Sequence, residues 1–114
     1  MAFQSNIPNV KRLIKQKTKE AMNMIVNDLT RRSKQLAPLD TGDLRGAGEG
    51  KVNDRNNDII GTVSFNKPYA LVQHEDLSFH HPRGGQAKYL EQPLNENRDR
   101  YKDFIKNKIR EVTE

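Results

Sequence analysis

The chain has 114 residues, no cysteine and a net charge of +5, and 33% of its residues are hydrophobic. This length fits one domain with a modest core, and the lack of cysteine excludes disulfides and thiol chemistry. No apolar run approaches membrane-spanning length, and residues 1–12 lack the apolar core of a signal peptide. We therefore expect a soluble protein that is not secreted by that route.

The first predicted element is a long helix that starts near Asn6 and ends at about Leu36. Pro8 suits a first helical turn, and Pro38 disfavours helical backbone at the residue before it. Apolar residues recur between these limits at helical spacing: Val10, Leu13, Ile14, Ala21, Met24, Ile25, Leu29 and Leu36. Asp28 and Arg32 lie one turn apart and predict an ion pair. A helix this long exceeds what a small domain can bury, so we expect one end to project.

The next predicted elements are a turn and a hairpin. Asp40-Thr41-Gly42-Asp43 is typical of a turn, and no apolar strand precedes it as an aspartic protease would require. Residues 44–52 predict a weak, Gly-rich strand, and residues 54–58 predict a turn. Residues 59–65 predict the best strand, with one face formed by Ile59, Gly61, Val63 and Phe65.

The stretch from Pro68 to Leu94 contains the remaining predicted elements. Residues 69–75 favour a short helix or a tight turn, and residues 78–88 favour a long mobile loop. Residues 87–91 could add a third strand, and residues 93–112 predict an amphipathic terminal helix. The predicted fold is α+β: one domain, 1–114, with two helices on a small antiparallel sheet and a short helix and a flexible loop inserted.

Ligand-type side chains are present in this stretch, but their spacing does not predict a metal site. His74, Glu75, His80 and His81 are such residues. They lack the HExxH pattern, and two of them lie in a predicted loop. We expect no metal, no cofactor and no catalytic residues.

Two short motifs resemble those of the small neck proteins of long-tailed bacteriophages, which are known as minor capsid, head–tail joining or tail-completion proteins. The first motif is APLDTGDLR at residues 37–45, and the second combines YA at 69–70, Glu75 and KYLEQPL at 88–94. Many relatives have glycine after the glutamate, where this chain has Asp76. The residues that carry the resemblance are Asp40, Thr41, Gly42, Leu44, Tyr69, Ala70, Glu75, Tyr89, Leu90, Glu91, Gln92 and Pro93.

The resemblance implies a structural virion protein, assembled in the host bacterial cytoplasm, that is not an enzyme. Its partners would be head connector or stopper proteins and tail tube or tail terminator proteins. Self-association would form a ring, with sixfold symmetry expected, around a channel through which DNA passes without sequence-specific binding; no membrane is involved. We interpret the motif residues as structural and expect partner contacts at Phe79, His80, His81, Arg83, Lys11, Lys15 and Lys19.

Charge patterning leaves a second hypothesis open. Residues 1–36 hold eight Lys/Arg and two Asp/Glu, so the first helix is strongly basic. This helix could bind nucleic acid, or its charged face could simply be solvated. A metal-dependent hydrolase that uses the His/Glu residues is a more distant third hypothesis.

Overall fold

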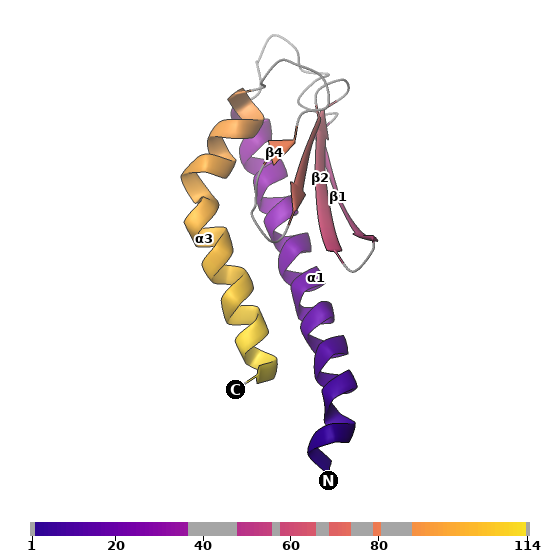
Figure 1. The fold of residues 1–114 in the computed structure, drawn as a ribbon. Helices are drawn as coiled ribbons and strands as arrows, with labels where there is room; N and C mark the ends of the chain where they lie inside the picture. The colour runs from indigo at the N-terminus through magenta and orange to yellow at the C-terminus, as the bar shows by residue number, and fades with distance from the viewer. Residues whose placement is uncertain are drawn as a thin grey trace.

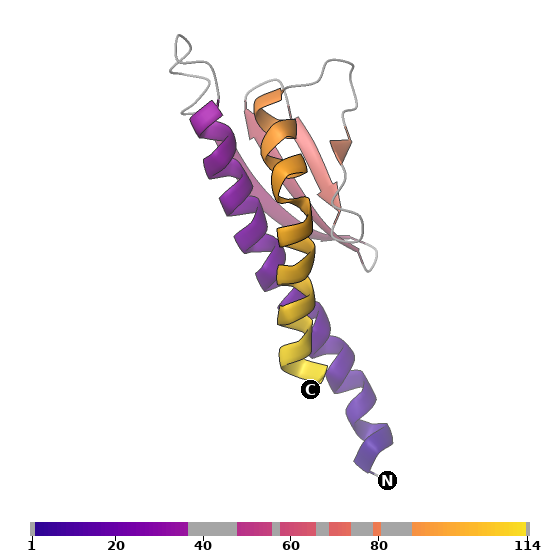
Figure 2. The ribbon, with the colours of Figure 1, turned by 90° about the vertical axis from the view of Figure 1, so that its left-hand side faces the viewer.

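A computed structural model describes residues 2–36, 48–55, 58–65, 69–73, 79–80 and 88–113. The elements are, in order, α1 (Ala2–Leu36), β1 (Gly48–Arg55), β2 (Asp58–Phe65), β3 (Tyr69–Gln73), β4 (Phe79–His80) and α3 (Lys88–Thr113). The body is elongated, 63 × 24 × 21 Å, and the two helices run along its length (Figure 1). The first turns of α1 extend beyond the end of α3 (Figure 2), as the length of this helix predicts.

The fold is α+β, with two long helices packed against an antiparallel sheet, as the sequence predicts. The strand order is β1-β2-β3-β4. Strands β1 and β2 form a hairpin whose register runs from Gly48 opposite Phe65 to Arg55 opposite Asp58. Alternate residues of β2 are buried, which confirms its predicted inner face: Ile59, Gly61, Val63 and Phe65.

Helix α1 approaches the hairpin closely because two glycines line the contact. A Cβ atom built on Gly50 or on Gly61 would collide with a methyl group of Val26, which lies between them. A Cβ on Gly50 would also lie 2.7 Å from the hydroxyl oxygen of Thr30. Gly50, which helps to make β1 a weak strand in isolation, and Gly61 of β2 therefore make room for the helix.

The hydrophobic core lies between α1, the hairpin and α3. Helix α3 packs along α1, and its first turn reaches the end of β2, where the rings of Tyr89 and Phe65 meet edge to face at 5.3 Å. The buried hydrophobic residues are Ala21, Met22, Ile25, Val26, Leu29, Ile59, Val63, Phe65, Leu90, Leu94, Tyr101 and Ile105.

The short helix predicted at residues 69–75 is wrong where the structure describes it, because Tyr69–Gln73 is strand β3. Five residues are too few for a stable isolated helix. The same segment gains a full ladder against β2, from Ser64 opposite Tyr69 to Ile60 opposite Gln73. Among the described residues no short helix is present.

The predicted loop at residues 78–88 contains regular structure at two places. Phe79 and His80 form β4 opposite Val72 and Leu71, and Lys88 is the first residue of α3. These three residues therefore belong to regular elements rather than to a loop. The rest of the predicted loop lies outside the described residues.

The third strand predicted at residues 87–91 is wrong as well. Lys88–Glu91 forms the first turn of α3, which begins five residues before the predicted start at Pro93. Pro93 removes one helical hydrogen bond, whose acceptor would be the carbonyl of Tyr89. Complete burial of Leu90 and the contact between Tyr89 and Phe65 offset this loss.

Other boundaries differ by a few residues. Helix α1 begins at Ala2 rather than near Asn6 and ends at Leu36 as predicted. Strand β1 continues to Arg55, and β2 begins at Asp58, so polar residues assigned to a turn extend both strands. Pairing of Asp54 with the buried Ile59 explains this extension, because strand pairing satisfies the hydrogen bonds of the backbone N–H and C=O groups whether the side chain is polar or apolar.

Candidate functional site

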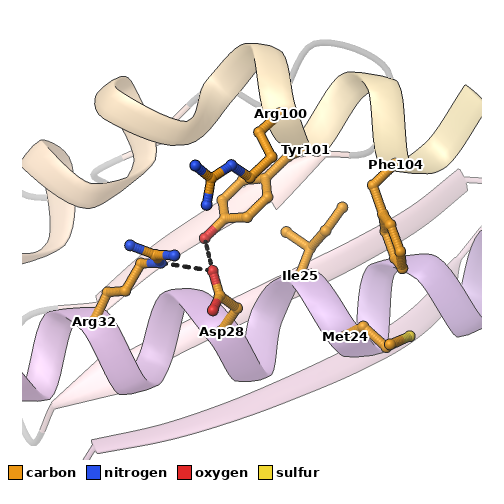
Figure 3. A pocket seen from close by; sticks show the side chains of 7 residues that line it. All are labelled: Met24, Ile25, Asp28, Arg32, Arg100, Tyr101 and Phe104. Carbon is orange, nitrogen blue, oxygen red and sulfur yellow. Dashed lines mark hydrogen bonds and ion pairs between the residues drawn. The ribbon is translucent and has the colours of Figure 1, made fainter.

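A groove of about 230 Å³ opens between α1 and α3. Both helices contribute side chains that recur every three or four residues, and this spacing places them on the same helix face. The lining residues are Met24, Ile25, Asp28 and Arg32 from α1 and Arg100, Tyr101 and Phe104 from α3 (Figure 3).

The carboxylate of Asp28 joins the two helices at one end of this groove. Arg31 Nη2 donates to Asp28 Oδ1 at 2.5 Å, and Arg32 Nε donates to Oδ2 at 2.7 Å. The hydroxyl of Tyr101 donates to the same Oδ2 at 2.6 Å from α3. The predicted pair of Asp28 and Arg32 is therefore confirmed and belongs to a larger network.

This network sets the charge states at the polar end of the groove. Burial raises the pKa of the Asp28 carboxyl, but hydrogen bonds from Tyr101, Arg32 and Arg31 outweigh burial and hold that pKa below its ordinary value. Burial and the bond to Asp28 raise the pKa of the Tyr101 hydroxyl well above its ordinary value. Near neutral pH Asp28 is therefore charged and Tyr101 neutral, and neither is poised to exchange a proton.

The two ends of the groove differ in chemistry. The guanidinium groups of Arg32 and Arg100 lie near Asp28, whereas the side chains of Met24 and Phe104 lie at the other end, with Ile25 between (Figure 3). Met24 is 53% exposed although it is a large hydrophobic residue. The groove can therefore receive an apolar group beside an anionic one, but it holds no free base or nucleophile.

The predicted contact lysines lie on α1 away from this groove. Lys15 Nζ lies 2.7 Å from Asp54 Oδ2 and Lys19 Nζ lies 4.0 Å from the same atom, so an acid at the end of β1 offsets part of the basic face. Lys11 is exposed on the same helix. Phe79 and His80 lie in β4, while His81 and Arg83 are outside the described residues.

The residues of the second motif lie at the junction of sheet and helix. Five of them form the first turns of α3: Tyr89, Leu90, Glu91, Gln92 and Pro93. Leu90 and Pro93 are buried there, whereas Gln92 Nε2 donates to Glu96 Oε1 at 2.9 Å on the surface. Tyr69 and Ala70 lie in β3, and the remaining motif residues are outside the described part: Asp40, Thr41, Gly42, Leu44 and Glu75.

Within the described segments no group of three or more His, Asp or Glu side chains could hold a metal ion. His80 lies in β4, and His74, Glu75 and His81 are outside those segments. No helix in the same segments is apolar enough over a sufficient length to cross a membrane.

The sequence interpretation missed the groove because its polar end depends on a contact across 73 residues. Tyr101 fits the apolar stripe of α3, and only its hydroxyl distinguishes it from a plain core residue. A buried tyrosine hydroxyl needs a partner, and Asp28 is one acid on the facing helix that could supply it.

Searches against family models, curated proteins and solved structures found no match for this chain.

Proposed function

We propose that this chain is a structural protein of the neck of a tailed bacteriophage, joining the DNA-filled head to the tail as part of a ring around the DNA channel. It would act in the virion without catalysis or cofactor. Its neighbours would be connector or stopper proteins of the head and tail tube or tail terminator proteins, and sixfold symmetry is expected.

The observation that carries this proposal is the pair of motifs at residues 37–45 and 69–94, in that order in one short chain. Each motif is short, and their combination is more specific than either alone. Together they span about half of the chain; α1 precedes them, and α3 begins within the second motif.

The packing of α3 supports a scaffold role for the second motif. Leu90 is completely buried, and the Tyr89 ring contacts Phe65 at the end of β2. Residues that hold a sheet to a helix in this way leave the partner contacts to other surfaces. We assign those contacts to Phe79, His80, His81, Arg83 and the basic face of α1.

Deletion of the gene from the phage that encodes the chain tests the proposal, with the wild-type chain supplied in trans as the control. We expect DNA-filled heads and unattached tails by electron microscopy without the chain, and complete particles when it is supplied. Immunogold labelling should place the chain between head and tail. Complete infectious particles from the deletion would refute the proposed function.

A second candidate function is nucleic-acid binding through α1, favoured by the exposed side chains of Lys11, Lys15 and Lys19. Binding through phosphate contacts must weaken steeply as salt rises. Titration of a short DNA duplex at rising NaCl concentrations, with Lys11→Glu compared with wild type, tests this candidate. An affinity that changes with neither salt nor this substitution would exclude it.

A further inference from the structure

The groove between α1 and α3 carries excess positive charge at its polar end. Asp28 is already bonded to Arg31 and Arg32. Arg100 is exposed and makes no ion pair with any described residue, although its guanidinium lies at the same end (Figure 3). Two guanidinium groups thus pair with one carboxylate and a third, from Arg100, lines the same groove, so an added anion would meet a net attraction.

The apolar end of the groove is incompletely covered. Met24 is one of two large hydrophobic residues exposed by more than 40% in the described chain, and Phe104 beside it is half-buried. A groove of about 230 Å³ has room for a large aliphatic or aromatic side chain. Burial of such a side chain against Met24 and Phe104 would remove apolar surface from water.

The spacing of the two ends matches one turn of helix. Arg100 and Phe104 are four residues apart on α3, which is a rise of about 6 Å along the helix axis. A partner helix with an apolar residue and an acidic residue four positions apart presents the same separation. Amphipathic helices bind in apolar grooves through anchors at this spacing.

A second copy of this chain does not supply such a segment with an unpaired acid from its described surface. Met24 has Glu20 and Asp28 four positions away, but Glu20 pairs with Lys17 at 3.6 Å and Asp28 pairs with Arg31 and Arg32. The other large exposed hydrophobic residue is Leu36, which is 47% exposed. On α1, which ends at Leu36, the charged residues within one turn of Leu36 are Arg32 and Lys34. Its approach would add positive charge to the positive end of the groove, so the partner is a different protein.

We infer that the groove between α1 and α3 is a docking site for a helical segment of a partner protein that carries an apolar residue and, four positions away, an acidic residue. The apolar side chain lies against Met24 and Phe104, and the carboxylate pairs with Arg100. This inference deepens the proposed function by giving the chemistry of a neighbour's contact segment, and it rests on that function only for the identity of the neighbour.

Methionine-methyl NMR of the full chain tests the inference, because the sequence has three methionines. Met24 reports on the groove, and the completely buried Met22 serves as an internal reference. The probes are two synthetic alanine-rich helical peptides that differ at one position: one has Leu and, four residues later, Glu, and the other has Lys in place of Glu. We expect the Glu peptide to shift the Met24 signal in a saturable titration and to bind at least tenfold more tightly than the Lys peptide.

Two substitutions and a matched control separate docking from general electrostatics. Arg100→Glu and Met24→Gln change exposed side chains and should each weaken binding of the Glu peptide by at least fivefold. Lys102→Glu makes the same charge change on α3 at an exposed residue outside the groove, and it should weaken binding by less than twofold. Circular dichroism of each variant checks that the fold is retained.

Equal binding of the two peptides, an unshifted Met24 signal, or equal effects of Arg100→Glu and Lys102→Glu would overturn the inference. Octanoate is the small-molecule comparison, and a shift of Met24 by octanoate but not by the Glu peptide would also overturn it. Immunogold labelling at the neck together with no peptide binding would refute the docking site and leave the proposed function standing. Peptide binding together with no labelling at the neck would refute the proposed function and leave the docking site standing.

Discussion

Replacement of Tyr101 by phenylalanine removes one hydroxyl and leaves the buried ring in place. That hydroxyl donates a hydrogen bond to Asp28 Oδ2 at 2.6 Å, and this bond connects α3 to α1 at the groove. The ring itself is 3% exposed, so Tyr101→Phe keeps the apolar packing of the core. The substitution therefore measures the contribution of one charge-assisted hydrogen bond.

A hydrogen bond to a charged group contributes about 1.5–3 kcal/mol to stability. The Asp28 side chain is 26% exposed and keeps both arginine partners, so water replaces part of the lost bond. We therefore expect a loss near the lower limit, about 1.5 kcal/mol. For a domain of this size that loss corresponds to a fall in Tm of roughly 6 °C.

Urea unfolding followed by circular dichroism at pH 7 measures this loss. Tyr89→Phe is the matched control, because it removes a hydroxyl that has no hydrogen-bond partner among the described residues, and it should change stability by less than about 0.5 kcal/mol. Tyr101→Phe should lower the free energy of unfolding much less in an Asp28→Asn background, because the interaction between the two side chains depends on the Asp28 carboxylate. Equal losses in the two backgrounds would refute the assigned role of the pair.

The remaining predictions concern packing and pH. Ser33→Ala should raise stability by about 0.5–1.5 kcal/mol in the same urea assay, because the Ser33 hydroxyl is completely buried and has no hydrogen-bond partner among the described residues; a loss of stability would contradict this. Gly50→Val and Gly61→Val should each cost at least about 2 kcal/mol through overlap with Val26, whereas Lys51→Val, at an exposed residue of the same strand, should cost little. The Asp28 pKa is lower in the folded state, so its contribution holds above the unfolded-state pKa of about 4 and is lost as pH falls below it. The Tyr101 pKa is raised, so its contribution holds below about pH 10 and is lost as pH rises above that; Tyr101→Phe should flatten the alkaline loss of stability and Asp28→Asn the acid loss.

Periodicity in the sequence predicted the elements that bury a regular stripe. The two long helices and β2 satisfy this condition, and their inner residues agree with the structure: Ile25, Leu29, Leu94, Ile105 and alternate residues of β2. Tyr69–Gln73 was misassigned because five residues carry too little period to separate strand from helix, and pairing with β2 decides between them. Local sequence signals cannot report such pairing.

The groove illustrates the same limit for a candidate site. The spacing of Asp28 and Arg32 within one helix is a local signal and was sufficient to predict their ion pair. The positions of Tyr101 and Arg100 depend on the rotation of α3 relative to α1, which is decided by core packing. The residue pattern of a single helix does not predict how that helix is rotated against its neighbour.

The contact of Val26 with Gly50 and Gly61 has a consequence for folding. In the native register, the Val26 methyl groups lie against two hairpin residues without side chains, Gly50 and Gly61. A hairpin shifted by two residues along β1 keeps its inner and outer faces but brings Val52 to the place of Gly50. Its larger side chain would then collide with Val26, and α1 could not dock. Docking of the helix thus rejects a hairpin shifted in this direction, and Gly50 acts as a steric check on that error of strand pairing as the chain folds.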